Sequence, residues 1–454
     1  MDRRDFLKLS MSGLAAIAVG SVKLPGIFGA EAYAATSTIN LTMMEAMVEM
    51  FDKTPVYHWV FASDIFNPLT VRALQQQPVA GPAPTNQLFP SFPGPVIFAT
   101  AGDTITLNVT NSISNLSATV PHAFQILGTK IKTGPIPFGE TRTITFRVPD
   151  AGSYMYVDPL NAPINRVLGL HGALISLPAA PAPGHRITPY SKPTPNVQQI
   201  FDDLGVPGSE LPPNQADVAA FGRGGWFHEV DRNRFRIWFI NSTDPTLNGE
   251  IEGGDMPTPA QFRARYVALY MMMNGRSGGF CSIHPDIKPS FMVGQPCLLR
   301  ILNAGMVQHS NHIHGNHVWV LAVNNQVRDN VFSVDVWSIR PLDRVDWLLP
   351  YRMPPDIPNR TGTGPGFQLP PTGLLRNNCS QELTTRPGGQ PWPLQRPMPY
   401  PMHCHSEPSQ AGAGGNYPGG LVTHWEIIGD IDGRTFEEHF GPDPLDPRFT
   451  TNPV

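Results

Sequence analysis

The chain repeats one pattern of short segments twice, and this duplication restricts it to few folds. The first copy runs from Pro93 to Ile175 and the second from Pro289 to Ile427. In both, short runs alternate apolar and polar residues between glycines and prolines, which is typical of half-buried antiparallel strands. The 50 prolines and 42 glycines among 454 residues also favour a loop-rich β protein. The predicted fold class is therefore all-β, with two Greek-key β-sandwich domains.

The two copies also set the predicted domain boundaries. We expect the first domain at 40–178 and the second at 230–430. Residues 179–229 are rich in proline, glycine and polar side chains, and are predicted to form a linker rather than a third sandwich. Residues 431–454 are predicted to form a C-terminal tail.

The N-terminus predicts an export signal over residues 1–34. Arg3 and Arg4 precede an apolar stretch from Met11 to Val19, and small residues stand at 32–34. This order is typical of a twin-arginine signal that is removed after export. The alternative is a membrane anchor, but the apolar stretch is shorter than the ~20 residues that a spanning helix needs. We expect a periplasmic or extracellular protein with no membrane span after removal of the signal.

Charge and cysteine content narrow the function classes further. The net charge is −4 and the signal carries the only basic pair that stands out, so nucleic acid is not an expected partner. Four cysteines occur, at 281, 297, 379 and 404. In an oxidising compartment Cys281 and Cys297 could form a disulfide, and buried free thiols are the alternative.

Two segments carry clustered metal-binding side chains. One reads Met402-His403-Cys404-His405, and the other, upstream, runs from His309 through His312 and His314 to a glycine. A thiolate together with imidazoles is the soft ligand set that copper electron-transfer sites use. On a strand, both neighbours of Cys404 would face away from its sulfur. One peptide would then connect two metal centres on opposite faces of a sheet.

These two segments resemble the last two copper motifs of the multicopper oxidase family. The resemblance implies cupredoxin-like domains, a copper cofactor and the transfer of electrons from a reductant to oxygen or another small acceptor. It assigns Cys404 and His309 to a type 1 copper, which would receive the electrons. The type 2 and type 3 copper ligands that it implies in this half of the chain are His312, His314, His403 and His405.

The type 1 ligand set departs from the family pattern. Members usually have a second imidazole five residues after the cysteine, where this chain has Ser409. The weak axial position falls on Leu421, which offers no ligand atom. Glu407 or Gln410 could supply an oxygen instead, and the alternative is an empty site.

The first copy keeps even fewer of the family's ligands. His122 remains from one histidine pair and is aligned here with His312, whereas Val157-Asp158-Pro159 stands at the other pair and has no histidine. By resemblance, His122 and His312 would form a type 2-like site. Two-domain members place such sites between subunits of a three-fold ring, so a homotrimer is one expected assembly.

Three functions therefore remain open. The first is an exported copper-dependent oxidoreductase with a small-molecule or protein electron donor. The second is a nitrite-reductase-like enzyme that uses His122 and His312. The third is a non-catalytic copper-binding or scaffold protein, because a fold can persist after its sites degenerate.

Residues outside the motifs allow some structural predictions. His171 and His424 occupy equivalent strands of the two copies and are predicted to be hydrogen-bonded rather than metal-bound. His58 has no partner pattern and is predicted at the surface or in a loop. Met271–Met273 is predicted to be a buried strand.

Overall fold

The computed structural model describes most of the two copies. The described residues are 17–18, 36–63, 71–72, 74–75, 88–116, 120–178, 184–203, 234–292, 294–352, 398–413, 415 and 417–429. The twin-arginine pair, the C-terminal tail and Cys379 lie outside these ranges, as does most of the predicted linker.

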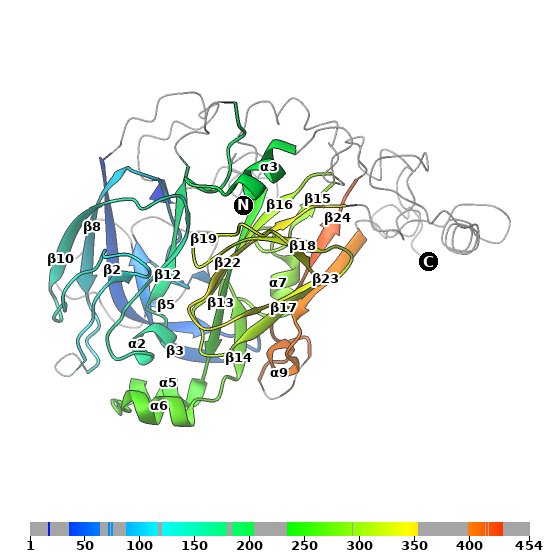
Figure 1. Ribbon diagram of the computed structural model, residues 1–454. Helices are drawn as coiled ribbons and strands as arrows, with labels where there is room; N and C mark the ends of the chain where they lie inside the picture. The colour runs from blue at the N-terminus through cyan, green and yellow to red at the C-terminus, as the bar shows by residue number, and fades with distance from the viewer. Residues whose placement is uncertain are drawn as a thin grey trace, which may run out of the picture.

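The described chain forms four β-sheets, two from each half (Figure 1). The larger sheet of the first half has the order β10 (Thr141–Arg147), β8 (Thr104–Asn111), β2 (Thr36–Glu49), β3 (Pro55–Ser63), β6 (Phe89–Phe92), β4 (Val71–Arg72), with β5 (Leu74–Gln75) paired to β2. The smaller has the order β1 (Ile17–Ala18), β7 (Ile97–Thr100), β12 (His171–Leu177), β11 (Gly152–Val157), β9 (Gln125–Ile126).

The second half forms a corresponding pair of sheets. Its larger sheet has the order β14 (Tyr270–Met273), β13 (Phe235–Thr243), β16 (Cys297–Asn303), β22 (Arg344–Leu349), β18 (Val318–Val323), β19 (Gln326–Val327), with β20 (Ser333–Val334) paired to β18. Its smaller sheet has the order β15 (Ser290–Phe291), β24 (Val422–Ile427), β23 (Met398–Cys404), β17 (His309–Ile313), β21 (Val336–Ile339).

Strand directions confirm that the two halves are duplicates. The parallel pairs β2–β8 and β7–β12 of the first half correspond to β13–β16 and β15–β24 of the second. The antiparallel pairs β11–β12 and β9–β11 correspond to β23–β24 and β17–β23. The mainly β class is thus confirmed, while the division into two independent domains at the proposed boundaries stays a prediction.

Residue alternation explains why these segments pair as strands. In β8, Ile105, Leu107 and Val109 are buried, and the intervening threonine and asparagine side chains are partly exposed. An outward threonine bonds across the ladder, with 3.2 Å between the hydroxyls of Thr106 and Thr145. Period-two burial of β-branched and aliphatic residues is the pattern that a one-sided sheet requires.

The two halves are held together by packed sheets and by buried polar contacts. Phe98 and Ile175 of the first half share one hydrophobic cluster with Ile237 and Phe239 of the second. The polar contacts include Ser153, whose hydroxyl donates to Asp346 Oδ1 at 2.7 Å. Strands such as β13 are consequently buried almost throughout, unlike β8.

Short helices close the ends of the sheets. They are α2 (Ile164–Val167), α3 (Pro195–Asp203), α5 (Pro245–Glu252), α6 (Pro259–Arg265), α7 (Gly279–Ile283) and α9 (Glu407–Gln410). Asp244 caps α5 by accepting from two backbone N–H groups, and Thr258 and Gln261 form a capping box on α6. Among the described residues, no helix is long and apolar enough to cross a membrane.

The described part of the predicted linker packs on the second half. Tyr190, together with Val197 and Phe201 of α3, belongs to a hydrophobic cluster with Leu298 and Leu348. Residues 184–203 are therefore attached to the larger sheet of that half.

Several smaller predictions can be compared with the structure. Met271–Met273 lies in the buried strand β14, as predicted. Cys281 and Cys297 are buried free thiols and form no disulfide. His58 was predicted at the surface, which is wrong, because it lies on β3 and is fully buried. Burial of β3 against the second half explains this, since the His58 Nε2 lies 3.1 Å from the Thr243 hydroxyl.

Candidate metal centre

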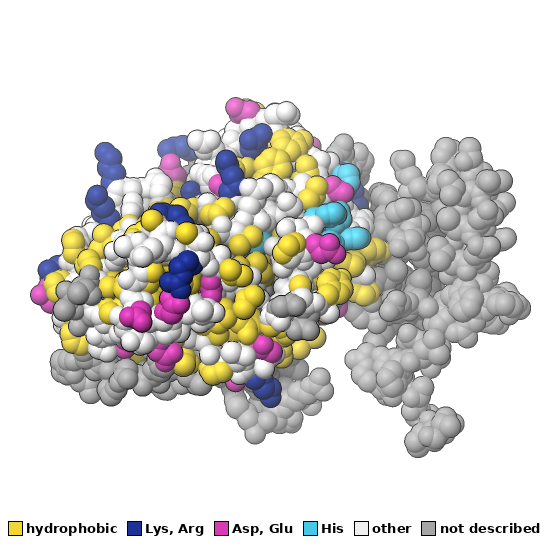
Figure 2. Space-filling view, turned by 90° about the horizontal axis from the view of Figure 1, so that it is seen from below, with side chains coloured by type: hydrophobic (Ala, Val, Ile, Leu, Met, Phe, Trp, Pro, Cys, Tyr) yellow, Lys and Arg dark blue, Asp and Glu magenta, His cyan; other side chains and the backbone are white. Residues whose placement is uncertain are grey.

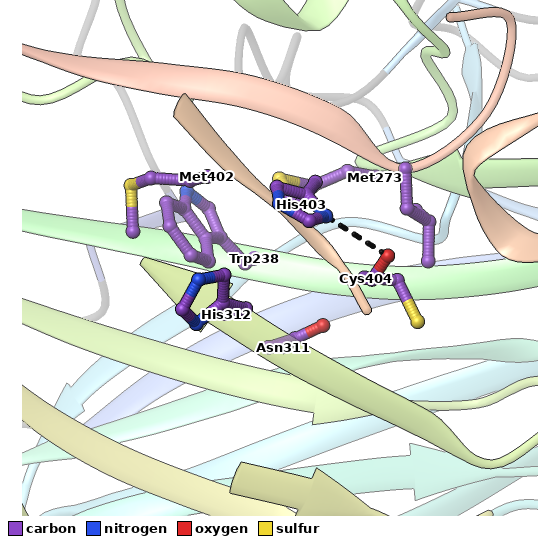
Figure 3. A pocket seen from close by; sticks show the side chains of 8 residues that line it. Trp238, Met273, Asn311, His312, Met402, His403 and Cys404 are labelled. Atoms are coloured by element: carbon purple, nitrogen blue, oxygen red, sulfur yellow. Dashed lines mark hydrogen bonds between the residues drawn. The ribbon is translucent and has the colours of Figure 1, made fainter. Parts of the chain in front are cut away.

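Strands β17 and β23 bring the two predicted motifs together. In their antiparallel ladder, His312 lies opposite His403 and Asn311 opposite Cys404. Because side chains alternate along a strand, the histidines and the cysteine project from opposite faces of the sheet. Figure 3 shows the sulfur of Cys404 turned away from the imidazoles of His312 and His403. The predicted separation into two faces is confirmed.

The outer face carries a histidine cluster, consisting of His312, His314, His403 and His405. The ligand nitrogens of the first three lie within 4.8 Å of one another. The His314 Nε2 and the His403 Nε2 are 3.2 Å apart. Two ~2.0 Å metal–nitrogen bonds at a tetrahedral angle place their nitrogens about 3.3 Å apart. The described geometry thus suits one shared metal ion.

The fourth histidine stands beside this group. The His405 ring centroid is 5.3 Å from that of His312. His314 and His405 are exposed, and His312 and His403 are partly buried. Figure 2 shows histidine side chains gathered at one place on the surface, next to acidic side chains. The cluster is therefore accessible to a metal ion and to a small ligand from solvent.

Backbone carbonyls orient two of these imidazoles. His312 Nδ1 lies 2.9 Å from the Asp335 carbonyl oxygen, and His403 Nδ1 lies 3.1 Å from the Cys404 carbonyl oxygen (Figure 3). A carbonyl only accepts, so Nδ1 carries the hydrogen and Nε2 keeps its lone pair for a metal. Sequence reasoning missed Asp335, because it lies in a turn between β20 and β21 that no motif marks.

Electrostatics keep two imidazoles of the cluster available as ligands. Partial burial lowers the pKa of His314, and the neighbouring imidazoles lower it further. Burial, followed by His312 and His405, lowers the pKa of His403 despite the bond to the Cys404 carbonyl. Both imidazoles are therefore neutral at neutral pH, which is the form that binds metal.

The inner face carries a buried group of three polar side chains, Cys404, His309 and Ser409, which together are called the inner pocket. The Cys404 Sγ is 3.6 Å from the His309 Nδ1, which in turn is 3.2 Å from the Ser409 Oγ. The backbone N–H of Ser310 points at the same sulfur from 3.3 Å. All three pocket side chains are buried, and burial lowers the pKa of His309 to about 4.

Ser409 is an oxygen-bearing residue that reaches this pocket, which the suggested Glu407 does not. Ser409 lies on α9 with its hydroxyl on His309, whereas Glu407 is exposed. Leu421 is buried beside them and lines a cavity of about 10 Å³ together with Cys404. The inner pocket therefore has one imidazole, one thiol and one hydroxyl.

The first half contains a counterpart of this pocket. In β9 and β11, Gln125 lies opposite Val157, just as His312 lies opposite His403. Asp158 follows Val157 as Cys404 follows His403, so Asp158 corresponds to Cys404. His309 lies three residues before His312, so its counterpart lies three residues before Gln125. That residue is His122. Its alignment with His312 was wrong, because a lone histidine cannot fix the register of a degenerate motif.

The contacts of His122 agree with this register. Its Nδ1 lies 2.9 Å from the Asp158 Oδ2, and Asn165 of α2 approaches the same nitrogen at 3.5 Å. The Asp158 N–H donates to the Leu170 carbonyl at 2.9 Å, as the Cys404 N–H donates to Leu421 at 3.0 Å. The two pockets thus share one framework but differ in their polar atoms.

His122 does not join the histidine cluster in the described chain. Its side chain is 1% exposed, and its Nε2 is buried with no hydrogen-bond partner. A ligand shared between subunits would need a nitrogen that faces solvent. The intersubunit site with His122 stays a prediction, and this burial does not favour it.

The remaining predicted histidines have hydrogen-bond partners. His171 Nδ1 lies 2.7 Å from the Arg166 carbonyl, and His424 Nε2 lies 2.8 Å from Glu426 Oε1. Both therefore have the hydrogen-bonded character that the sequence predicted.

Comparisons with known proteins agree with the observed fold. A family model described as multicopper oxidase matches residues 77–180, in the first half. The structure is similar to a blue copper oxidase from Nitrosomonas europaea, at 16% identity over 86% of both chains, with a TM-score of 0.50. It is also similar to the multicopper oxidase mgLAC, at 16% identity over 87% of this chain and 86% of that chain, with a TM-score of 0.51.

A search of curated proteins gave no match. The family model covers the half that lacks the copper motifs, whereas the shared fold extends over both halves. The chain thus resembles the multicopper oxidase family in one segment of its first half, and its fold over both halves is similar to that of solved multicopper oxidases.

Proposed function

We propose that the protein is an exported copper-dependent oxidoreductase whose reactive copper is held by the histidine cluster. The observation that carries this proposal is the convergence of His312, His314 and His403, whose ligand nitrogens lie within 4.8 Å of one another. Copper bound there would supply one-electron redox chemistry and a coordination position for oxygen or a related small acceptor. The exposure of His314 and His405 leaves room for that acceptor.

The inner pocket is proposed to receive electrons from a small-molecule or protein donor. Supporting this role, one peptide carries Cys404 together with His403 and His405. The Cys404 carbonyl accepts the hydrogen bond from His403, so the two faces are joined by covalent bonds and one hydrogen bond. Export by the twin-arginine route and assembly as a homotrimer are parts of the proposal that rest on sequence reasoning.

The nitrite-reductase-like alternative is not favoured. It requires His122 beside His312, but His122 bonds to Asp158 in the counterpart pocket of the first half. A non-catalytic copper-binding protein differs from the proposal in one measurable respect. It would bind copper at the cluster without oxidising a reductant.

The cluster can be tested with the double variant His312→Ala/His403→Ala. Removing two of the three convergent imidazoles should remove most of the copper held by the cluster and abolish oxygen consumption with a small one-electron reductant. Metal analysis and an oxygen electrode measure the two effects. The matched control is His185→Ala/His284→Ala, since neither residue belongs to the convergent group.

Unchanged copper content in the His312→Ala/His403→Ala protein would exclude the cluster as the metal site. Lost copper without any turnover in the parent protein would support the non-catalytic alternative instead.

A further inference from the structure

The separations in the inner pocket are suitable for a metal ion. Bonds of ~2.3 Å to sulfur and ~2.0 Å to nitrogen at a tetrahedral angle place the two ligand atoms about 3.5 Å apart. The Cys404 Sγ and the His309 Nδ1 are 3.6 Å apart, and the Ser409 Oγ lies 3.2 Å from the same nitrogen. A weak hydrogen bond between sulfur and nitrogen has a similar length. The choice of metal ion is therefore argued from the chemical type of the ligand atoms.

The donor atoms do not match a blue copper site. Such a site holds Cu(II) with a thiolate and two imidazoles in one plane, usually with a weak axial ligand. Here Ser409 offers a neutral hydroxyl where a second imidazole would be needed, and the buried Leu421 beside Cys404 offers no donor atom. The pocket thus has two strong ligands, a number that a soft, low-coordinate ion tolerates better than Cu(II).

The net charge of the bound metal also favours Cu(I) over Cu(II) in this pocket. Cu(II) bound to one thiolate leaves a net positive charge, whereas Cu(I) bound to one thiolate is neutral. His309 is 0% exposed and Cys404 is 1% exposed, so water cannot solvate the extra charge. Uncompensated charge is costly in such surroundings. Thiolate ligation also selects Cu(I) among the common metal ions.

We propose that the pocket of Cys404, His309 and Ser409 binds copper as Cu(I), and that Ser409 sets this preference for the reduced ion. This inference rests on the proposed function in one respect, namely that the inner pocket is a copper site. It adds that the pocket rests in the reduced state, so that only a strong oxidant at the cluster would withdraw its electron.

The first half supplies the matched comparison. There the same framework holds Asp158 in place of Cys404, with His122 at 2.9 Å. A carboxylate is a hard ligand and does not favour Cu(I). Because the fold already accommodates Asp158 at the equivalent position, Cys404→Asp tests the sulfur with a residue that this framework accepts.

The experiment uses the full chain carrying His312→Ala/His403→Ala, so that the cluster does not contribute. Under anaerobic conditions, the protein competes for Cu(I) with the chromogenic chelator bicinchoninate. We expect it to retain about one Cu(I) per chain. Adding Cys404→Asp should abolish that retention.

The oxidation state is tested by exposing the Cu(I)-loaded protein to air, with oxygen as the oxidant. With Ser409 present, we expect no intense visible band from a thiolate–Cu(II) bond, and the X-ray absorption edge should be that of Cu(I). Ser409→His supplies the missing imidazole and should produce the band. Ser406→His adds the same side chain nearby on the loop and should not produce it.

Three results would overturn the inference. They are a stable thiolate–Cu(II) band in air with Ser409 present, equal Cu(I) retention after Cys404→Asp, and a folded, Cu(I)-loaded Ser409→His protein that gains no band in air. If Ser409→His does not fold, the absorption edge with Ser409 present decides alone. The His312→Ala/His403→Ala variant separately tests the proposed function. Its copper content and oxygen consumption report on the cluster, while the side chains of the inner pocket are unchanged.

Discussion

The free energy of unfolding of the copper-free protein should fall steeply as the pH is lowered from 6.5 to 4.5, with the fully buried His58 and His171 among its causes. Both histidines are fully buried. Burial lowers the pKa of His58 to about 4 and that of His171 to about 3. Each ring is already hydrogen-bonded in its neutral form, to the Val56 and Arg166 carbonyls respectively.

The sign follows from proton binding in the two states. Below its ordinary pKa of about 6.5, an unfolded histidine binds a proton, whereas each buried histidine stays neutral until the pH approaches its lowered value. The unfolded state therefore gains protons first, and acid favours it. Between these values each histidine contributes about 1.4 kcal/mol per pH unit, so His58 alone accounts for roughly 3 kcal/mol by pH 4.

Urea titrations at several pH values would measure this effect. His58→Asn keeps a donor for the Val56 carbonyl but does not titrate, so the slope of unfolding free energy against pH should decrease by about 1.4 kcal/mol per unit. His317→Asn is the control, because His317 is exposed and should leave the slope unchanged. An identical slope in the parent and His58→Asn proteins would show that His58 is protonated in the folded state.

The second large effect is expected at the buried junction of the two halves. Asp346 accepts from the Ser153 hydroxyl at 2.7 Å and from the Tyr190 hydroxyl at 3.0 Å, and Arg300 Nη1 lies 3.4 Å from it. The Asp346 and Arg300 side chains are 3% and 1% exposed. Asp346→Ala leaves the Arg300 charge buried without its carboxylate, which should cost about 3–5 kcal/mol of stability.

Two further variants separate charge from hydrogen bonding. Asp346→Asn keeps one acceptor oxygen and places an NH2 group, from which a hydroxyl can accept, at the position of the other, so it should lose less stability than the alanine variant. Glu140→Ala breaks an exposed ion pair, in which the side chains of Glu140 and Arg142 are 47% and 46% exposed. This change should lower the free energy of unfolding by at most about 1 kcal/mol. Denaturant unfolding measures all three. A loss for Asp346→Ala no larger than that for Glu140→Ala would refute the role of this junction.

Local pattern was sufficient to predict the parts of the structure that depend on periodicity. The duplication gave the strands, and the period of two placed Cys404 on the face opposite His403 and His405. Contacts between residues far apart in the sequence could not be predicted from this local pattern. His58 lies on a strand with apolar residues on both faces, and its Nε2 meets Thr243 of the second half. Asn165 of α2 joins the His122 pocket of the first half, and Asp335 joins the histidine cluster from a turn; neither has a sequence signal.

The error at His122 has a different physical origin. A single remaining histidine fits more than one position of a motif, and only the β9–β11 ladder shows which position it occupies. Likewise, the sequence identified Ser409 as the position of the missing imidazole. It could not show that the Ser409 hydroxyl faces His309, because that depends on how α9 folds back over the sheet.

The backbone of Cys404 links the two faces mechanically as well as electronically. Its carbonyl fixes His403 of the cluster, and its N–H donates to Leu421, whose own N–H donates to the Ser409 carbonyl. A displacement of this one peptide must therefore disturb both sets of ligands. Occupancy of either face should change the affinity of the other by the same factor, since coupling between binding sites is reciprocal. The protein would then respond to copper as a single cooperative unit.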